Sequence, residues 1–288
     1  MYLRIYTKAL FLSLHLIASG LLTQATLAQG NSSYEHRIIS LAPHITELLY
    51  EVGAGDSIVG TVSFSDYPKE AKDIPRIGNS DQISFEQVLT LQPTLILGWE
   101  SGNGDETLNR FRSLGFTVHS HEPKTLEDVA QSLSRFGELT GNPIQGLEAS
   151  KRFSTRLKSL RERYENQTPV ATFYQLWNEP KMTINGDHLI SDVIQLCGGS
   201  NIFSDAVLLV PKINAETVIQ RAPAVIIGSG IADERPVWLD EWSNWRTIPA
   251  AQNEHLFSIH PDLLHRHSPR ILDGAEQMCE FLDRARSN

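Results

Sequence analysis

A short stretch near the C-terminus concentrates side chains that can take part in chemistry. Residues 261–271, PDLLHRHSPRI, include Asp262, His265 and His267 together with two arginines, and His260 directly precedes them. Carboxylate and imidazole groups at this spacing suit a metal site, a catalytic acid–base centre or the polar wall of a binding cleft. The residue types alone do not choose among these three.

The surroundings of this stretch favour a binding cleft. The preceding residues 256–259, LFSI, are typical of a strand, and Ser268 followed by Pro269 predicts the N-cap and first turn of a C-terminal helix. The stretch would then be a loop at the carboxyl end of a strand, where α/β folds bind their ligands. We therefore expect it to form part of a ligand cleft.

Motifs of the common enzyme classes are missing from the chain. It contains no G-x-S-x-G elbow, no H-E-x-x-H zinc motif, no P-loop and no G-x-G-x-x-G fingerprint. We therefore expect a protein that is not an enzyme and has no catalytic residues, no resident metal and no cofactor. The alternative is a secreted metal-dependent hydrolase that uses His260, His265, His267 and Asp262.

The N-terminus has the features of a secretory signal peptide, which we expect over residues 1–28. Arg4 and Lys8 precede an apolar run over 9–22, and small residues lead up to Ala28, where cleavage is expected. The alternative is an uncleaved membrane anchor. No later apolar run approaches the ~20 residues that span a bilayer, so we expect the mature chain to be soluble outside the cytoplasm.

Charge narrows the possible partners. The chain of 288 residues has a formal net charge of −9, and removing residues 1–28 takes away two basic and no acidic residues, which leaves −11. Such an acidic exported protein is a poor partner for nucleic acid or for an anionic membrane surface.

The two cysteines, Cys197 and Cys279, are the only ones in the chain. An even number in an oxidising compartment predicts one disulfide, which over so long a loop would contribute roughly 2–4 kcal/mol to stability. The alternative is a pair of buried free thiols. Two cysteines are too few for a zinc cluster.

Strand-like and helix-like segments alternate along most of the chain. Residues 37–42 and 93–99 are typical of strands, and residues 105–115 and 125–141 are typical of helices. This alternation predicts an α/β protein with largely parallel sheets. Residues 143–166 interrupt it with a charged segment whose apolar residues fall near helical spacing, which predicts a helix about 35 Å long.

An internal repeat indicates two lobes of similar plan. SFEQVLTLQPTLILG at 84–98 matches NAETVIQRAPAVIIG at 214–228, and each copy has an N-cap residue, a first-turn glutamate, a proline and a buried strand. The glutamates are Glu86 and Glu216. Each one singly would complement a helix N-terminus, whereas together they would suit arginines on a two-fold symmetric partner.

These patterns predict a domain organisation. We expect an N-terminal α/β lobe over 37–142, one long connecting helix over 143–167 and a C-terminal α/β lobe over 168–288. Both lobes would have mostly parallel central sheets.

Several motifs together resemble the periplasmic solute-binding proteins of ABC importers, the family that carries cobalamin, iron siderophores and haem. The resemblance covers essentially the whole mature chain, and it is greatest to the cobalamin-binding members. It rests on the segments RIISLAPHITELLYEVGAGDSIVGTVSFSDYP, GNSDQISFEQVLTLQPTLILGW, LCGGSNIF and SPRI. It implies two α/β lobes joined by a rigid helix, a ligand cleft between the lobes, a periplasmic location and a monomer.

The resemblance also implies roles for single residues. Phe64, Trp99 and Trp177 stand at positions of cleft aromatics, and Phe64 replaces a tyrosine that stacks against the corrin ring. Asp262 and Arg266 match a polar pair that hydrogen-bonds the amide arms of the corrin. The disulfide Cys197–Cys279 and the docking of Glu86 and Glu216 onto arginines of a permease dimer are also implied.

Two positions depart from the family pattern. Ser80 and Val210 stand where the enteric cobalamin-binding member carries tryptophans, which leaves the exact ligand open. The same fold binding haem or a ferric siderophore is the alternative, and His44 or His265 would then be the candidate haem ligand. We expect cobalamin, or a related corrinoid, as the transported ligand.

Overall fold

The computed structural model describes residues 36–230 and 235–287. The expected signal peptide, residues 1–28, lies outside this part of the chain. Within the described residues, no helix combines the length and apolar character that crossing a membrane requires.

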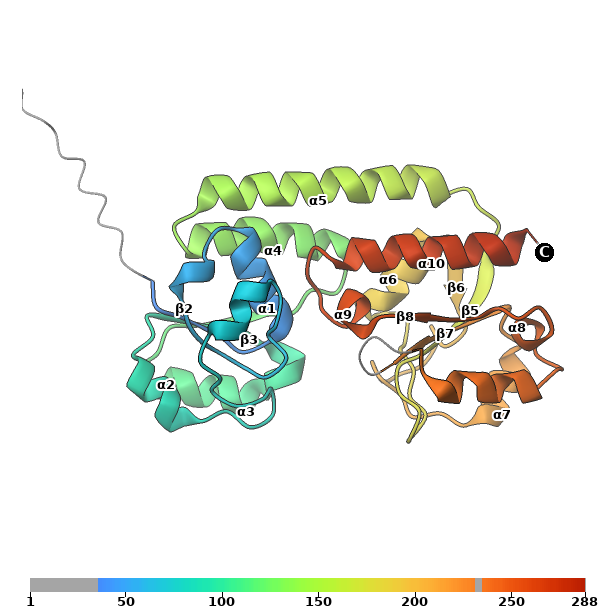
Figure 1. The fold of residues 1–288 in the computed structure, drawn as a ribbon, viewed down its shortest axis with the longest axis horizontal. Helices are drawn as coiled ribbons and strands as arrows, with labels where there is room; N and C mark the ends of the chain where they lie inside the picture. Colours follow the sequence, from blue (N-terminus) through green and yellow to red (C-terminus); the bar gives the residue numbers. More distant parts are fainter. Residues whose placement is uncertain (1–35, 231–234, 288) are drawn as a thin grey trace, which may run out of the picture. The chain divides into compact units, whose positions relative to one another are not determined.

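The N-terminal lobe is built on a four-stranded parallel sheet with the order β2-β1-β3-β4 (Figure 1). Its strands are β1 (Ile38–Ser40), β2 (Ile58–Thr61), β3 (Leu95–Trp99) and β4 (Val118–His121). Its helices are α1 (Pro43–Glu51), α2 (Phe85–Leu91), α3 (Glu100–Ser113) and α4 (Leu126–Leu139).

The C-terminal lobe repeats this plan with the order β6-β5-β7-β8, again all parallel. Its strands are β5 (Val170–Gln175), β6 (Gly199–Asn201), β7 (Val225–Ser229) and β8 (Leu256–Ile259). Its helices are α6 (Leu189–Leu196), α7 (Ala215–Arg221), the 3₁₀ helix η3 (Val237–Asn244), α8 (Pro249–Gln252), α9 (Pro261–Leu264) and α10 (Ile271–Arg286). The predicted fold class is confirmed.

The two copies of the internal repeat are similar in structure as well as in sequence. Ser84 caps α2 by accepting from the backbone N–H of Gln87, and Asn214 caps α7 by accepting from that of Thr217. Both helices end on a left-handed residue, with φ 46° at Gln92 and 45° at Ala222. The two copies therefore start and stop by the same backbone geometry.

Each sheet buries both faces, but against different partners. Ile38 of β1 joins a core that runs through both lobes, whereas its neighbour Ile39 joins a core confined to the N-terminal lobe. Ile226 and Ile227 of β7 divide in the same way. Alternate residues of a strand point to opposite faces, so one face of each sheet contributes to a shared core.

Helix α5 (Pro143–Tyr164) runs along both lobes (Figure 1). Its buried stripe, which includes Phe153 and Leu157, belongs to the shared core. Arg161 pairs with Glu127 of α4, and Arg156 pairs with Asp273 of α10, each at 2.6 Å. The apolar stripe carries most of this attachment, because exposed ion pairs contribute little.

The disulfide Cys197–Cys279 is present and joins the end of α6 to α10, with a sequence separation of 82 residues. Both cysteines are fully buried in the shared core. Free thiols, the alternative, are excluded.

Candidate functional site

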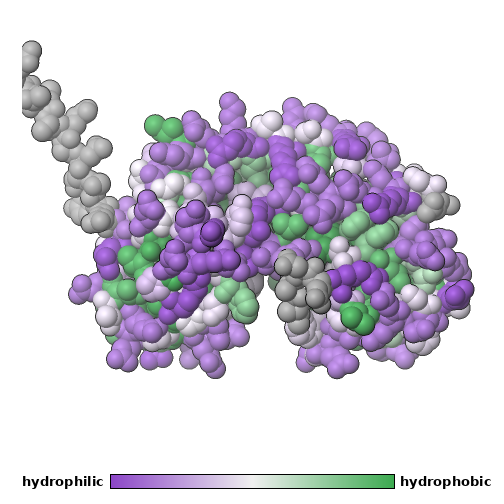
Figure 2. Space-filling model, viewed as in Figure 1, coloured by the Kyte–Doolittle hydropathy of each residue, from purple (hydrophilic) through white to green (hydrophobic). Residues whose placement is uncertain are grey.

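A cleft of about 1720 Å³ lies between the two lobes. Figure 2 shows the molecule hollowed between the lobes on the side away from α5. Described residues at or just beyond the carboxyl ends of strands line it, among them Trp99 at the end of β3, Glu122 after β4, Leu176 after β5, Gly230 after β7 and His260 after β8. Parallel α/β sheets bind ligands at this edge. The volume exceeds the ~300–1,000 Å³ typical of sites for drug-sized molecules, so the cleft suits a large ligand.

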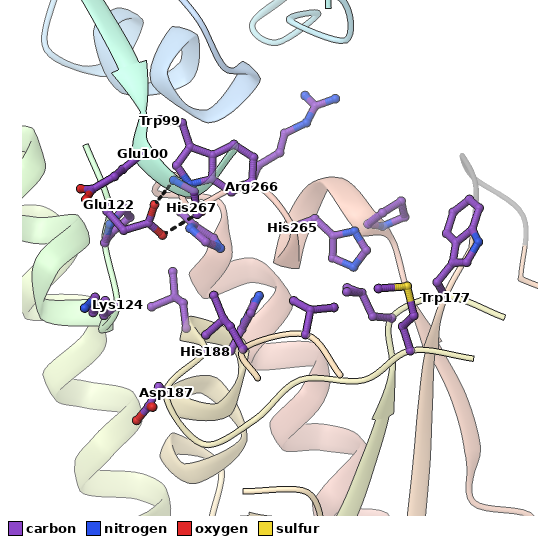
Figure 3. Close-up of a pocket in the computed structure, with 18 of the residues that line it drawn as sticks. Trp99, Glu100, Glu122, Lys124, Trp177, Asp187, His188, His265, Arg266 and His267 are labelled. Carbon is purple, nitrogen blue, oxygen red and sulfur yellow. Dashed lines mark hydrogen bonds between the residues drawn. The ribbon is translucent and has the colours of Figure 1, made fainter. Parts of the chain in front are cut away.

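Most of the residues expected to contact ligand line this cleft (Figure 3). They are Phe64, Trp99, Trp177, Val210, Asp262 and Arg266. Ser80 is not among the lining residues; it is half-buried, and its carbonyl oxygen accepts a hydrogen bond from Asn103 Nδ2 at 3.2 Å. Residues from five distant segments of the sequence thus line one cleft, and Ser80 is the one candidate that does not line it.

The aromatic candidates offer open faces to the cleft. Phe64 is 76 % exposed, and Trp177 is 47 % exposed. Phe64 also holds a φ of 66°, in the left-handed region that bulky residues seldom occupy. An exposed aromatic ring on a strained backbone contributes little to the core, so Phe64 is a candidate for ligand contact.

A chain of buried hydroxyl groups supports the loop that carries Phe64. Thr46 on α1 bonds Thr61 at the end of β2 at 2.8 Å, and Thr61 donates to Ser65 at 2.8 Å. Arg76 also donates to the carbonyl oxygen of Ser65 at 2.8 Å. These bonds hold the backbone on the C-terminal side of Phe64 in place, so the ring is positioned without packing of its own.

Two apolar residues of the cleft lining next to the expected Val210, namely Val207 and Leu209, were missed by sequence reasoning. Val207, Leu209 and Val210 all line the cleft, and Val207 is 96 % exposed. The signal was available, because the run VLLV stands in a segment without strand or helix periodicity. These side chains present apolar surface to the cleft.

A second missed feature is Glu47 on α1, which is only 4 % exposed. It accepts from Arg266 Nη1 at 3.0 Å, from Arg270 Nε at 2.9 Å and from Ser268 Oγ at 2.5 Å. All three donors belong to the C-terminal lobe, so this carboxylate ties the two lobes together. Sequence reasoning had no signal for it, because a glutamate within a short helix is usually exposed.

Arg266 is shared among three carboxylates. Besides Glu47, it contacts Asp66 Oδ1 at 2.7 Å and Asp262 Oδ1 at 2.8 Å. Burial raises the pKa of Asp262 despite the neighbouring arginine. Burial alone would also raise the pKa of Asp66, yet the hydrogen bond and charge of Arg266 leave it below its ordinary value.

The expected cap of the C-terminal helix is wrong. Helix α10 begins at Ile271 and Arg270 occupies the N-cap position, without a capping hydrogen bond from its side chain. The hydroxyl of Ser268 donates to Glu47 instead. A hydrogen bond to a buried charged group is stronger than an ordinary one, so the tertiary partner prevails over the local one.

Imidazole rings from both lobes meet beside Trp99. His44 lies 5.4 Å from His121 and 5.7 Å from His267 between ring centroids, and 5.2 Å from Trp99. Ring atoms His44 Nε2, His121 Nε2, His267 Nδ1 and Trp99 Nε1 are buried without a hydrogen-bond partner among the described residues. This group of three histidines, the interlobe histidine cluster, is therefore poorly solvated.

Burial keeps the interlobe histidine cluster uncharged. It lowers the pKa of His121 to about 4 and that of His267 to about 3, with repulsion from neighbouring histidines adding to the effect. Burial lowers the pKa of His44 as well, with further contributions from His121, His267 and Arg266. These rings are neutral at pH 7.

Residues 261–270 form the short helix α9 and the loop before α10. Their histidines and Asp262 do not converge: His265 Nε2 bonds Tyr174 Oη at 2.9 Å, whereas His267 packs against His44. Across residues 36–230 and 235–287, no group of three or more His, Cys, Asp or Glu side chains is arranged to hold a metal ion. The geometry therefore gives no support to a metal-dependent hydrolase.

Glu86 and Glu216 occupy equivalent exposed positions. Each lies in the first turn of its helix, α2 or α7, and neither forms an ion pair with any other described residue. Both helices lie at the lower edge of the view in Figure 1, on the side away from α5.

Comparison with known proteins matches residues 38–263 to the model of the periplasmic binding protein family. The vitamin B12-binding protein of Vibrio cholerae is 39% identical over 249 residues, covering 85% of this chain and 88% of that protein. That of Vibrio campbellii is 34% identical over 264 residues, covering 92% and 94%.

Solved structures of periplasmic binding proteins superpose on this chain. The crystal structure of the periplasmic vitamin B12 binding protein of Vibrio cholerae superposes with a TM-score of 0.81 at 38% identity, covering 88% of this chain and 98% of that one. A periplasmic haem-binding protein of Roseiflexus sp. RS-1 superposes with a TM-score of 0.73 at 24% identity, covering 87% and 99%. The second match shows a common fold alone.

Proposed function

The chain belongs to the periplasmic binding protein family, and from this premise we propose that it captures cobalamin in the periplasm and delivers it to an inner-membrane ABC importer. Members of this family carry solutes and are not enzymes. Cobalamin is the transported ligand and not a cofactor of the protein.

The observation that carries the proposal is the cleft itself. It is large, open to solvent and lined by exposed aromatic and apolar side chains, with Asp262 and Lys124 among its polar members. Cobalamin combines a flat apolar macrocycle with a fringe of amides, so aromatic faces supply contact area and a few polar groups set orientation. Relatives named for vitamin B12 at 39% and 34% identity favour this ligand over haem or a siderophore.

Titration calorimetry with cyanocobalamin tests the proposal. We expect binding at micromolar concentration or tighter, and no heat in that range would contradict it. A visible spectrum of the protein purified from its native host is a second test, since corrinoids and haem absorb differently. A haem spectrum would point to the alternative ligand.

Trp177→Ala is expected to weaken cyanocobalamin binding by roughly 30-fold, as expected for losing about 2 kcal/mol from one aromatic contact. The matched control is Trp245→Ala, because Trp245 is 45 % exposed, almost as exposed as Trp177, and does not line the cleft. We expect the control to bind as tightly as the wild type. Equal affinities of the two variants would remove Trp177 from the binding site.

We further propose that Glu86 and Glu216 dock onto arginines of the permease dimer. Two unpaired carboxylates at equivalent places on two similar lobes suit a two-fold symmetric cationic surface, with one monomer placed across the symmetry axis. We also propose that residues 1–28 act as a cleaved signal peptide.

Glu86→Ala combined with Glu216→Ala is expected to leave cyanocobalamin affinity unchanged and to lower cellular uptake by about tenfold. Glu148→Ala with Glu280→Ala is the matched control, because these exposed glutamates lie on α5 and α10, away from α2 and α7 (Figure 1). Full uptake by the first double variant would contradict the docking role.

A further inference from the structure

Among the imidazole rings that line the cleft outside the interlobe histidine cluster, two have hydrogen bonds that define where their proton sits. They belong to His188, at the N-cap of α6, and His265, directly after α9. Both are half-buried, and Figure 3 shows His265 among the lining side chains, between Trp177 and Arg266. Their hydrogen bonds determine which ring nitrogen carries the proton.

A relay of hydrogen bonds sets the tautomer of His265. Ser229 Oγ donates its only proton to the carbonyl oxygen of Ile259 at 3.2 Å, so it must accept from Tyr174 Oη at 2.8 Å. Tyr174 has then used its own proton, and it must accept from His265 Nε2 at 2.9 Å. The proton of His265 therefore sits on Nε2.

The other nitrogen of His265 is bare. Burial lowers the pKa of the ring to about 4, so the ring carries a single proton at pH 7. Among the described residues, none hydrogen-bonds Nδ1, and this atom is not among the buried unpartnered ring nitrogens. It therefore presents a lone pair to the cleft and acts only as an acceptor.

His188 has the opposite hydrogen-bonding role and offers a donor. Its Nδ1 accepts from the backbone N–H of Ile190 at 3.1 Å, and burial lowers the pKa of the ring to about 4, so its single proton sits on Nε2. Like Nδ1 of His265, this Nε2 has no partner among the described residues. The cleft lining thus contains one imidazole fixed as an acceptor and one fixed as a donor.

We infer that His265 Nδ1 accepts a hydrogen bond from an amide N–H of the bound corrinoid, and that this contact makes the cleft select amide arms over carboxylate arms. The inference rests on the proposed function. A primary amide both donates and accepts, so amide arms can satisfy an acceptor such as His265 and a donor such as His188. A carboxylate has no proton to donate and would leave two lone pairs facing each other, and a site built to accept a proton rejects a group that lacks one.

Calorimetry on the full chain tests this selectivity. The ligands are cyanocobalamin and the monocarboxylic acids made by partial hydrolysis of its amide arms, each tested separately. For the wild type, we expect at least one acid to bind about tenfold more weakly than cyanocobalamin. In His265→Phe, cyanocobalamin binding should weaken by about tenfold, and the preference over that acid should disappear.

Two further variants separate this role from a general structural one. Tyr174→Phe keeps His265 but removes the hydroxyl that holds its proton on Nε2, so either ring nitrogen can then carry the proton. The preference for the amide should therefore shrink while cyanocobalamin still binds. His188→Phe removes a donor that serves amide and carboxylate alike, so it should keep or increase the preference. A preference that His265→Phe leaves intact would overturn the inference.

A spectroscopic readout distinguishes this inference from the proposed function. In protein labelled with nitrogen-15 at histidine, we expect free His265 to show a protonated Nε2 and a bare Nδ1 whose resonance shifts on adding cyanocobalamin. Cyanocobalamin binding with an unchanged Nδ1 resonance would overturn the inference alone, whereas absence of binding would overturn the proposed function as well. An imidazole-type visible spectrum with aquocobalamin, lost in His265→Phe, would also overturn it, because Nδ1 would then ligate cobalt.

Discussion

Replacing Glu47 by alanine is expected to lower the free energy of unfolding by about 3–5 kcal/mol. The substitution removes the carboxylate that accepts from Arg266, Arg270 and Ser268. Arg266 is 7 % exposed and, of its carboxylate partners in the described part of the chain, would keep only Asp66 and Asp262, while Arg270 would lose its main counter-charge. The cost arises chiefly from leaving buried charge without compensation.

Glu51→Ala is the matched control for this prediction. Glu51 lies one turn further along α1 and pairs with Arg152 at 2.6 Å, but its side chain is 39% exposed. An ion pair in this setting contributes about 0–1 kcal/mol, so the control should unfold nearly as the wild type does. Denaturant titration of both variants gives the comparison, and equal losses would show that burial of Glu47 carries no special weight.

Glu47→Gln separates charge from shape. Glutamine keeps the volume and one acceptor oxygen, but it loses the negative charge and introduces two donors that face arginines. We expect its stability to fall between those of the wild type and Glu47→Ala. A stability equal to that of the wild type would show that packing, and not the charge, joins the lobes here.

Acidification from pH 7 to pH 5 is expected to lower the free energy of unfolding by several kcal/mol through the interlobe histidine cluster. Burial lowers the pKa of His121 to about 4 and that of His267 to about 3, and it also lowers the pKa of His44. In the unfolded chain these rings have a pKa of about 6.5 and take up protons first. The contribution of these neutral rings to the free energy of unfolding is therefore fully present above about pH 6.5. It declines as the pH falls towards the pKa values of the folded state.

The size of the effect follows from the same linkage relation. A ring with a pKa of about 4 in the folded state and about 6.5 in the unfolded state costs about 2 kcal/mol at pH 5. Asp128 raises the pKa of His121 and so reduces the loss of stability from that ring. Arg266 lowers the pKa of His44 and so increases the loss from that ring. Denaturant titrations between pH 7 and pH 5 measure the slope directly.

A substitution identifies the source of this pH dependence. His267→Phe removes one titrating ring from the cluster and keeps an aromatic side chain against Trp99. The loss of stability between pH 7 and pH 5 should then shrink by about 2 kcal/mol. Stability that is independent of pH in the wild type, or a slope that His267→Phe leaves unchanged, would contradict the role of the cluster.

Sequence reasoning predicted much of the framework because its signals act over short distances. A cap such as Ser84 or Asn214 bonds a backbone N–H three residues on, and strand burial follows neighbouring residues. Helix α5, the two parallel sheets, the disulfide and the duplicated plan of α2 and α7 all follow from such local patterns or from counting. The family resemblance added the cleft and most of its lining.

The amino-acid sequence by itself thus determined which segments form strands and helices, that two lobes share one plan and which residues lie at the carboxyl ends of the strands. Only the tertiary structure decided how Glu47, the interlobe histidines and the relay from Ser229 to His265 act. Glu47 and Arg266 are 219 residues apart in the sequence. Ser268 is separated from Glu47 by a similar number of residues, and it donates to this carboxylate instead of capping its own helix. Burial, pKa and tautomer depend on which distant side chains surround a group, and no local pattern along the chain encodes them.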